Sequence, residues 1–533
     1  MDPVTRVLAQ LVNLVPGGNK CGSDRPMEWD TRFHWRANLE PFILLSVVFL
    51  GFALRIHEIT AYSVWLDEAS TYFISIGSIP DILRGLRQPY GQAAPPLYHI
   101  ILHFSLLLGQ GELFLRLPSM VFGVLCIPAV YVLGKTFFGK SEGLMGALLL
   151  AISPFHVWYS QEARMYTLFL LFAMLSTMFL WDAWQSGRRR SWLCYCVATL
   201  LGCYTHFLTF LLIFCQGLFL VSASLVRSLG QVDAEARQRV REGLIGFGMS
   251  GVMLLLCYLP WISATLNKMG SSWPFPGPDI NFSYAMTILQ SFVGRDAACV
   301  TLFAFLFACG VGSGVSRRSA PAAFLVLLTL LPPVGVALFL QLVKSFFAAR
   351  YVIFVLGFFL LIVAWGLSGL SQATRRLARR ARVHPTPGSV VVVGAVLAGL
   401  LFGESRELRR YFSGQRWSED WRATAAFVRA NAADGDAIAF YQPWVQVPFD
   451  YYYDGALEQY QISYALLSGP KTSTDQAFDL ALHERLWMVF AYHRIPNSDY
   501  DLIRAYLDQH FTPVLDRTFQ GNIELVLYEK HDS

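Results

Sequence analysis

The sequence predicts a polytopic α-helical membrane protein that ends in a small α/β domain. Two observations on composition carry this prediction. Of the 533 residues, 54% are hydrophobic and only 15% are charged, whereas soluble domains average roughly 25% charged residues. The apolar residues also gather in blocks long enough to cross a bilayer, until the composition changes near residue 403. A soluble fold cannot cover so much apolar surface, so the bilayer must do so.

Eleven apolar blocks are predicted to span the membrane, and together they form a membrane domain over residues 39–403. The blocks cover residues 39–56, 114–134, 142–158, 165–184, 192–206, 207–226, 243–263, 298–316, 320–341, 351–370 and 389–403. One further apolar run, 97–108, is shorter than the about 20 residues that a spanning helix needs.

The distribution of lysine and arginine decides how the run 97–108 is interpreted. If it does not cross, the basic segments between the spans fall on the cytoplasmic side, as the positive-inside rule requires. They are the N-terminal arm and residues 135–140, 188–190, 227–241, 317–318 and 375–382. We therefore predict that 97–108 is a juxtamembrane or re-entrant helix in a first outer loop of about residues 57–113. A short, tilted span is the alternative.

This topology predicts three domains in a multi-pass protein of the cell (inner) membrane. Residues 1–38 form a cytoplasmic arm, residues 39–403 the membrane domain, and residues 404–533 an extracytoplasmic α/β domain. In the last of these, hydrophobic periodicity predicts helices and buried strands. The helices cover 421–430 and 501–510, and the strands 437–441 and 487–492.

The first outer loop carries two adjacent carboxylates, Asp67 and Glu68, in the segment Trp65-Leu66-Asp67-Glu68-Ala69. Residues 69–76 are predicted to form a short helix, whose dipole favours acids in the first turn. That is the purely structural interpretation. The functional one is a general base at the membrane surface that takes a proton from an acceptor hydroxyl.

Other ionisable residues interrupt apolar segments on the same predicted side. Glu162 and Arg164 lie between two spans, where ionisable groups are expensive and are functional candidates by default. Arg116 and Arg350 each lie at the start of a span on the predicted outer side, where a guanidinium group could bind a phosphate. The alternatives are an interfacial ion pair and snorkelling to lipid headgroups. His206, at an outer hairpin, is either an interfacial residue or a ligand-binding one.

Several motifs stand in an order that resembles the GT-C superfold of membrane glycosyltransferases. The resemblance is to the bacterial branch similar to protein O-mannosyltransferases and aminoarabinose transferases (ArnT-like), over about residues 40–370. The matching pieces are Trp65-x-Asp67-Glu68-Ala69, Pro95-Pro96-Leu97-Tyr98, Arg116-Leu117-Pro118-Ser119, Ser153-Pro154, the run from Tyr159 to Tyr166, and Arg350-Tyr351.

The resemblance implies a glycosyltransferase that moves a sugar from a polyprenyl-phosphate donor to an acceptor hydroxyl on the outer face, with inversion. Asp67 is then the base, Glu68 its helper, and Glu162 a further catalytic acid. The predicted substrate-binding residues are Arg116, Arg164, Tyr166, His206, Arg350 and Tyr351. No metal ligands are implied, and the cofactor requirement stays open. The implied partners are the donor, membrane lipids and an acceptor lipid, glycan or protein, with no nucleic acid.

Two other classes of function compete with this interpretation. A transporter or flippase would also be polytopic with ionisable residues, but such proteins usually hold their charged site near the bilayer midplane and often show internal repeats. No repeat is evident here. A membrane-anchored sensor would not need eleven spans.

Overall fold

The computed structural model describes residues 39–87, 94–229, 234–269, 277–380, 385–415, 418–462, 483–492 and 500–531. The predicted arm 1–38 lies outside this part of the chain. The chain divides into two compact units. The first contains residues up to 57, 78–108 and 116–411, and the second contains residues 58–77, 109–115 and 412–533.

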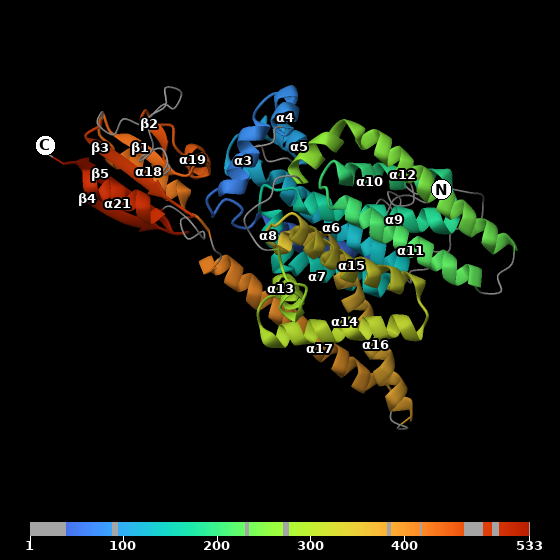
Figure 1. Ribbon diagram of the computed structural model, residues 1–533. Helices are drawn as coiled ribbons and strands as arrows, with labels where there is room; N and C mark the ends of the chain where they lie inside the picture. Colours follow the sequence, from blue (N-terminus) through green and yellow to red (C-terminus); the bar gives the residue numbers. More distant parts are fainter. Residues whose placement is uncertain are drawn as a thin grey trace, which may run out of the picture. The chain divides into compact units, whose positions relative to one another are not determined.

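The first unit is helical (Figure 1). Its helices are α2 (Leu39–Ile56), α4 (Ile79–Gly85), α5 (Leu97–Leu106), most of α6 (Glu112–Phe137), α7 (Lys140–Ile152), α8 (Pro154–Ser160), α9 (Tyr166–Ser186), α10 (Arg189–Cys203), α11 (Thr209–Leu229), α12 (Ala234–Met269), α13 (Phe282–Val293), α14 (Ala297–Ser316), α15 (Ala320–Leu342), η2 (Ala349–Val355), α16 (Leu356–Arg380) and α17 (Pro385–Arg410). The short helix η3 (Tyr411–Gln415) follows α17 and lies mostly in the second unit.

Seven helices in the described residues are long and apolar enough to cross a membrane. They cover Leu39–Ile56, Glu112–Phe137, Tyr166–Ser186, Arg237–Leu266, Ala297–Ser316, Ala320–Leu342 and Ala349–Arg380. The pair α7 and α8, bent by 62° at a break, makes an eighth if it is one span. The remaining predicted spans coincide with α10, α11 and α17, which are not among these helices, so the predicted count of eleven is not confirmed.

Helix α5 occupies most of the run 97–108. Its 10 residues rise about 15 Å, half of the about 30 Å of a hydrocarbon core. This length supports the prediction that the run does not span, while the sidedness of the loop stays a prediction.

The first half of helix α16 is enclosed within the first unit. Every residue from Leu356 to Leu367 is buried, and η2, just before it, is buried from Val352 to Val355. A helix that is apolar all round is expected to be enclosed by other helices. Helices α7, α14, α15 and α17 pack against α16, and η2 packs against α9. The late Arg350-Tyr351 motif is thereby fixed to the beginning of this core helix.

Two glycines allow α14 and α16 to approach closely. A Cβ on Gly310 would overlap the carbonyl oxygen of Ile362, and a Cβ on Gly366 would overlap that of Leu306. Small residues at such crossings let helix backbones come together in membranes, where packing rather than the hydrophobic effect drives association.

We therefore expect Gly366→Ala to destabilise the first unit, because the new methyl group must push two backbones apart. Overpacking of this kind costs about 1–3 kcal/mol, which thermal unfolding of the detergent-solubilised protein would detect. Gly312→Ala on α14 is the control, since its Cβ would meet open space. It should leave the unfolding temperature unchanged or raise it, because alanine favours helix over glycine. Equal effects of the two changes would contradict the close crossing.

The second unit contains a five-stranded sheet with the order β2-β1-β3-β5-β4. Strand β1 pairs in parallel with β2 and β3, while β5 pairs antiparallel with β3 and β4. The elements are α3 (Leu66–Ser75), α18 (Trp421–Asn431), β1 (Ala437–Tyr441), α19 (Pro443–Asp450), β2 (Glu458–Ile462), β3 (Arg485–Phe490), α21 (Tyr500–His510), β4 (Phe511–Phe519) and β5 (Ile523–Lys530).

Each face of this sheet has its own core. Trp421 of α18 and Phe449 of α19 pack with Trp487 on one face, while Ile503 of α21 packs with Met488 on the other. The strand interiors alternate between these two clusters, as period-two geometry requires. The predicted α/β tail is confirmed: α18, β1, β3 and α21 match the predicted elements to within two residues.

Two segments from the predicted first outer loop belong to the second unit. Residues 58–77, which include α3, and residues 109–115 cluster with residues 412–533. The compact unit therefore includes more than the predicted domain 404–533. A change of composition along the chain reveals where a domain begins in the sequence. It does not reveal that an earlier segment of the chain packs with that domain.

Candidate active site

Asp67 and Glu68 lie in the first turn of α3, which begins at Leu66 after an extended Trp65. Asp67 is half-buried, and Glu68 is 1% exposed. The Thr71 hydroxyl donates to the backbone carbonyl of Asp67 over 2.7 Å. The helix N-terminus favours negative charge at both acids. The predicted helical setting of the pair is therefore confirmed.

Helix α3 is held within the second unit by packing and hydrogen bonds. It packs against α19, and the rings of Tyr72 and Tyr451 meet edge to face with centroids 4.8 Å apart. Just before the helix, the Val64 N–H donates to the Tyr452 hydroxyl over 2.6 Å. These contacts orient the turn that carries Asp67.

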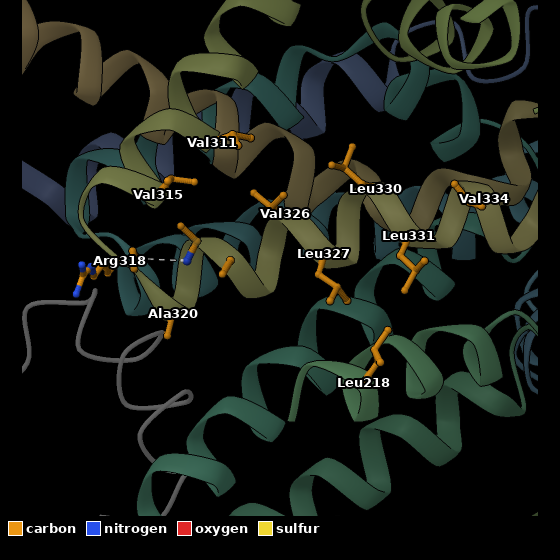
Figure 2. A pocket seen from close by; sticks show the side chains of 14 residues that line it. Leu218, Val311, Val315, Arg318, Ala320, Val326, Leu327, Leu330, Leu331 and Val334 are labelled. Carbon is orange, nitrogen blue, oxygen red and sulfur yellow. Dashed lines mark hydrogen bonds between the residues drawn. The ribbon is translucent and has the colours of Figure 1, made fainter. Parts of the chain in front are cut away.

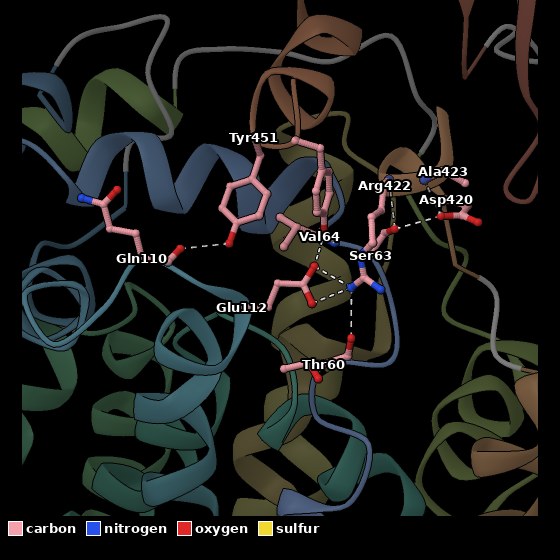
Figure 3. A network of polar contacts seen from close by, with 10 residues as sticks. Thr60, Ser63, Val64, Gln110, Glu112, Asp420, Arg422, Ala423 and Tyr451 are labelled. Atoms are coloured by element: carbon pink, nitrogen blue, oxygen red, sulfur yellow. Dashed lines mark hydrogen bonds and ion pairs between the residues drawn. The ribbon is translucent and has the colours of Figure 1, made fainter. Parts of the chain in front are cut away.

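A polar network fixes the loop segments further (Figure 3). One terminal nitrogen of Arg422 lies 2.6 Å from both carboxylate oxygens of Glu112 and 3.0 Å from the Thr60 carbonyl oxygen. The Ser63 hydroxyl donates to Asp420 over 3.1 Å and accepts the Arg422 N–H over 3.2 Å. Charge-assisted bonds of this kind are stronger than neutral ones. Residues 58–66 and 109–115 are thereby bonded to the start of α18.

A buried carboxyl, Glu419, belongs to the surroundings of Asp67. Burial raises the pKa of Glu419 to about 7, hydrogen bonds from Tyr492 and Trp421 oppose the rise, and the charge of Asp67 adds to it. This residue was not predicted from the sequence. Glu419 stands in a polar stretch, Ser418-Glu419-Asp420. An acid among polar residues does not indicate a buried or functional position.

In the first unit, three motifs of the family resemblance meet through Ser119. The Tyr98 and Ser119 hydroxyls are 2.6 Å apart, and the Ser119 hydroxyl donates to the Arg164 carbonyl over 2.8 Å. The Thr167 hydroxyl donates back to the Ser119 carbonyl over 2.9 Å. The beginnings of α5, α6 and α9 are therefore bonded together, which fixes the segments carrying Arg116 and Arg164.

Glu162 lies in the connection between α8 and α9. It is 2% exposed, and its Oε2 accepts the indole N–H of Trp158 over 3.1 Å. The neighbouring Gln161 donates its amide to the carbonyls of Arg55 and His57 over 3.0 and 2.7 Å. It also accepts the Tyr411 hydroxyl over 2.6 Å. Gln161 therefore positions the connection, and its role is structural.

Arg55, at the end of α2, is fully buried. It forms hydrogen bonds to the residues just before this connection. Its guanidinium donates to the carbonyls of Gly51, Leu150 and Ala151 over 2.8–3.1 Å. It also donates to the Ser160 hydroxyl and to His156 Nδ1. Leu150 and Ala151 end α7, whose carbonyls lose their helical partners at the bend. Arg55 supplies those partners. A charge at the end of an apolar span was the signal that could have identified it.

Tyr166 and His206 pack into an aromatic cluster. The His206 ring stacks on Phe169 at 4.6 Å between centroids, and it lies 6.4 Å from the Tyr166 ring. Its Nδ1 accepts the backbone N–H of Leu208 over 3.2 Å. Phe169 in turn contacts Phe354 of η2 at 4.7 Å between centroids. The chain segments of Tyr166, His206 and η2 therefore meet in the first unit.

Arg350 and Tyr351 stand at the start of η2, both half-buried. The Arg350 guanidinium lies 5.8 Å from the centre of the Tyr351 ring, within the range of a cation–π contact. Arg116, by contrast, is buried within α6. Of these two arginines, Arg116 is therefore the more enclosed, while Arg350 keeps part of its side chain exposed.

The predicted site residues thus fall on both units. The second unit holds Asp67 and Glu68. The first unit holds Arg116, Glu162, Arg164, Tyr166, His206, Arg350 and Tyr351. In the part of the chain that the structure describes, no three His, Cys, Asp or Glu side chains form a cluster suited to a metal ion.

An apolar groove of about 780 Å³ lies elsewhere in the first unit (Figure 2). Leu218 of α11, Val311 and Val315 of α14, and Leu327 and Leu331 of α15 line it. Apart from Arg318 at one end, the lining side chains offer no charged group. The lining contains no carboxylate or histidine that could act as a general base, so the candidate catalytic residues are the polar ones described above.

Comparison with known proteins extends the resemblance. Residues 93–232 match the family model described as dolichyl-phosphate-mannose-protein mannosyltransferase. None of the curated protein sequences matches the chain. Among solved structures, ArnT from Cupriavidus metallidurans in the apo state has a TM-score of 0.57 at 13% identity, over 93% of this chain and 98% of that one.

Two further solved structures agree with the first. ArnT from the same organism bound to undecaprenyl phosphate has a TM-score of 0.54 at 13% identity, with the same coverage of both chains. The Archaeoglobus fulgidus oligosaccharyltransferase AglB, in complex with an inhibitory peptide and a dolichol-phosphate, has a TM-score of 0.56 at 12% identity, over 86% of this chain and 70% of that one. The chain is therefore a multi-pass membrane protein with the GT-C fold, and its predicted resemblance to the protein O-mannosyltransferase and ArnT-like glycosyltransferases is confirmed.

Proposed function

We propose that the protein transfers a sugar from a polyprenyl-phosphate donor to an acceptor hydroxyl on the outer face of the cell membrane. The observation that carries the proposal is the bonding of Tyr98, Ser119 and Arg164, which joins three motifs of the resemblance in one place. The similar ArnT structure contains undecaprenyl phosphate, and the AglB structure contains dolichol-phosphate. Both support a lipid phosphate as the donor's carrier.

Donor binding falls to the first unit in this proposal. Arg116, Arg164 and Arg350 bind the phosphate, since guanidinium groups match phosphate oxygens and keep their charge. Tyr166, Tyr351 and His206 line the sugar, and aromatic contacts orient them: His206 stacks on Phe169, and Tyr166 meets Tyr159 edge to face. Glu162 lies in the connection between α8 and α9 and is oriented by its hydrogen bond from Trp158. In this proposal it contacts the sugar hydroxyls.

The proposed chemistry is a displacement at the anomeric carbon. The acceptor oxygen forms a bond to that carbon while the bond from carbon to the phosphate oxygen breaks, which inverts the configuration. Asp67 takes the acceptor proton as general base, with Glu68 as its helper, and polyprenyl phosphate leaves as the anion. The arginines stabilise the charge that grows on the leaving phosphate.

The orientation in the membrane forms part of the proposal. The excess of lysine and arginine between spans supports a cytoplasmic N-terminus and an extracytoplasmic C-terminal domain in the inner membrane. A lipid, glycan or protein acceptor then meets the base on the outer side.

We expect Arg116→Gln to raise the KM for the lipid donor by about 10- to 100-fold, because a charge-assisted bond to phosphate is worth about 1.5–3 kcal/mol. The measurement is release of polyprenyl phosphate from labelled donors by the purified full-length protein. Arg84→Gln is the control, since the Arg84 side chain is 71% exposed. An unchanged KM in Arg116→Gln would remove Arg116 from the donor site.

The same assay separates the proposal from its rival, a transporter or flippase of a lipid-linked substrate. A transporter moves its substrate without breaking a bond, so it releases no polyprenyl phosphate in detergent. Cleavage that requires a hydroxylated acceptor supports transfer. Absence of cleavage with every sugar donor, in the presence of lipid, glycan and peptide acceptors, would overturn it.

A further inference from the structure

The apolar groove in the first unit has a single charged side chain in its lining, that of Arg318, which lies at one end (Figure 2). The apolar side chains of Leu218, Val315, Leu330 and Val334 also line it, and all four are exposed. Helices α14 and α15, which form most of the lining, are long and apolar enough to cross a membrane. Exposed apolar surface of this kind is a site for membrane lipid or for another apolar partner.

The groove has the length of a lipid chain. It follows α15 from Ala320 to Val334, and the helix rises about 21 Å between these residues. One leaflet's share of the hydrocarbon core is about 15 Å thick. An acyl chain that enters at the Arg318 end can therefore lie along α15 through the whole depth of its leaflet.

The backbone at Arg318 is strained. Arg318 stands in the turn between α14 and α15 with a φ of +51°. The Ser319 N–H donates to the Gly314 carbonyl over 2.9 Å, which is a hydrogen bond of the Schellman motif. The left-handed residue of this motif is usually glycine, because a Cβ is disfavoured there. An arginine at such a position points to a function for its side chain, since strain of this kind gathers at ligand sites.

The two adjacent arginines of this turn differ in their partners. The Arg317 guanidinium lies 4.6 Å from the centre of the Trp365 ring and donates to the side chain of Gln372. The Arg318 side chain is exposed, and no carboxylate in the described part of the chain pairs with it. The N-terminus of α15, at Ala320, adds partial positive charge at the same end of the groove. The positive charge at this end is therefore available to a ligand.

We infer that the groove binds an anionic glycerophospholipid, with one acyl chain along α15 and the phosphate at Arg318. An apolar groove with a positive end is complementary to a lipid with a negative headgroup. The basic segment 317–318 is predicted to be cytoplasmic, and anionic phospholipids give the cytoplasmic leaflet its negative surface potential. The donor's carrier also joins an apolar chain to a phosphate, but Arg116 and Arg350, its proposed ligands, are predicted on the outer side. The inference is independent of the proposed reaction.

The experiment uses the full-length protein, delipidated in detergent, and phospholipids with a photoactivatable diazirine in one acyl chain. Phosphatidylglycerol is the anionic probe, and phosphatidylcholine, which has no net charge, is the comparison. After irradiation, mass spectrometry of the labelled peptides locates the chain. Phosphatidylglycerol should label residues 320–334 about fivefold more than phosphatidylcholine, the preference that one basic side chain gives at an anionic membrane surface. Equal labelling by the two probes would overturn the inference.

Arg318→Gly removes the charge while keeping the turn, because glycine is the favoured residue at a left-handed φ. Its unfolding temperature without added lipid should equal or exceed that of the wild type, and its preference for phosphatidylglycerol should disappear. Arg318→Lys should retain the preference. Arg189→Gln is the matched control, since Arg189 is exposed in another basic segment of the same predicted side and lies outside the lining. An unchanged preference in Arg318→Gly would overturn the role of Arg318.

Ala323→Trp tests the groove itself. Ala323 is an exposed residue of the lining, so the indole fills the groove without entering the core. Labelling of residues 320–334 by both probes should fall, whereas Ala395→Trp, at an exposed position of α17, should leave it unchanged. Undiminished labelling in Ala323→Trp would contradict binding in the groove. If unlabelled polyprenyl phosphate prevents the labelling in the wild type, the groove holds the donor's carrier and the assignment to a phospholipid fails.

Discussion

Asp67→Asn is expected to reduce sugar transfer by about 100- to 10,000-fold, the range that a positioned general base supplies. Asparagine has nearly the same size as aspartate but cannot accept the acceptor's proton at neutral pH. The contacts that hold α3, between Tyr72 and Tyr451 and between Val64 and Tyr452, do not involve the Asp67 side chain. Expression, membrane insertion and the unfolding temperature should therefore be retained, and the loss should appear in kcat.

Asp454→Asn provides the matched control for this substitution. Asp454 lies in the same unit, and its carboxylate is 89% exposed in an ion pair with Arg429, a kind of pair that contributes little. Its transfer rate should equal that of the wild type. Full activity of Asp67→Asn with a lipid-linked sugar would exclude Asp67 as the base.

Arg55→Leu is expected to destabilise the first unit more than any single change at its surface. The substitution leaves Leu150, Ala151 and their neighbours His156 and Ser160 without the donors that Arg55 supplies. One orphaned buried group costs about 1–3 kcal/mol. Leucine also avoids the desolvation cost of a buried guanidinium, which offsets part of this loss. A net loss of about 3 kcal/mol is expected.

The loss should appear as a lower unfolding temperature in detergent and a lower yield from the membrane. Arg55→Lys is the informative comparison, because an ammonium supplies three donors and keeps the charge; it should lie between Arg55→Leu and the wild type. Arg84→Leu, at an exposed arginine, controls for the loss of a charge. If Arg55→Leu unfolds at the wild-type temperature, the bend between α7 and α8 does not depend on Arg55.

Much of the fold could be predicted from the sequence because it depends on local patterns. The span from Leu39 to Ile56 was predicted residue for residue, and so was the strand from Ala437 to Tyr441. Apolar runs and period-two alternation are visible along the chain without knowledge of its partners. The count of spans could not be predicted in the same way, because α10 has only 15 residues and the apolar described part of α11 covers only Thr209–Leu225. Hydropathy does not define the length of a helix to within a turn.

Some residues of the candidate site could likewise be predicted from the sequence, and others could not. Glu162 stood out because it interrupts apolar segments, Arg116 because it lies at the start of a span, and Asp67 because two adjacent acids follow the first span. Arg55 could have been found by the same criterion, since it ends an apolar span. Glu419 could not, because an acid in a polar stretch is unremarkable until the fold buries it. What made it relevant, the approach of residues 58–77 to residues 412–533, depends on contacts that no local pattern encodes.

The composition of the second unit has a consequence for how the protein is made. Ser63 and Asp420, which bond to each other, are 357 residues apart in sequence. During synthesis the segment carrying α3 emerges early, long before Asp420 and α19, its partners in the second unit. Domains ordinarily fold from the N-terminus as the chain grows, but this unit can be completed only after residues 412–531 have been synthesised. The membrane helices between its two parts are therefore made before the unit can assemble.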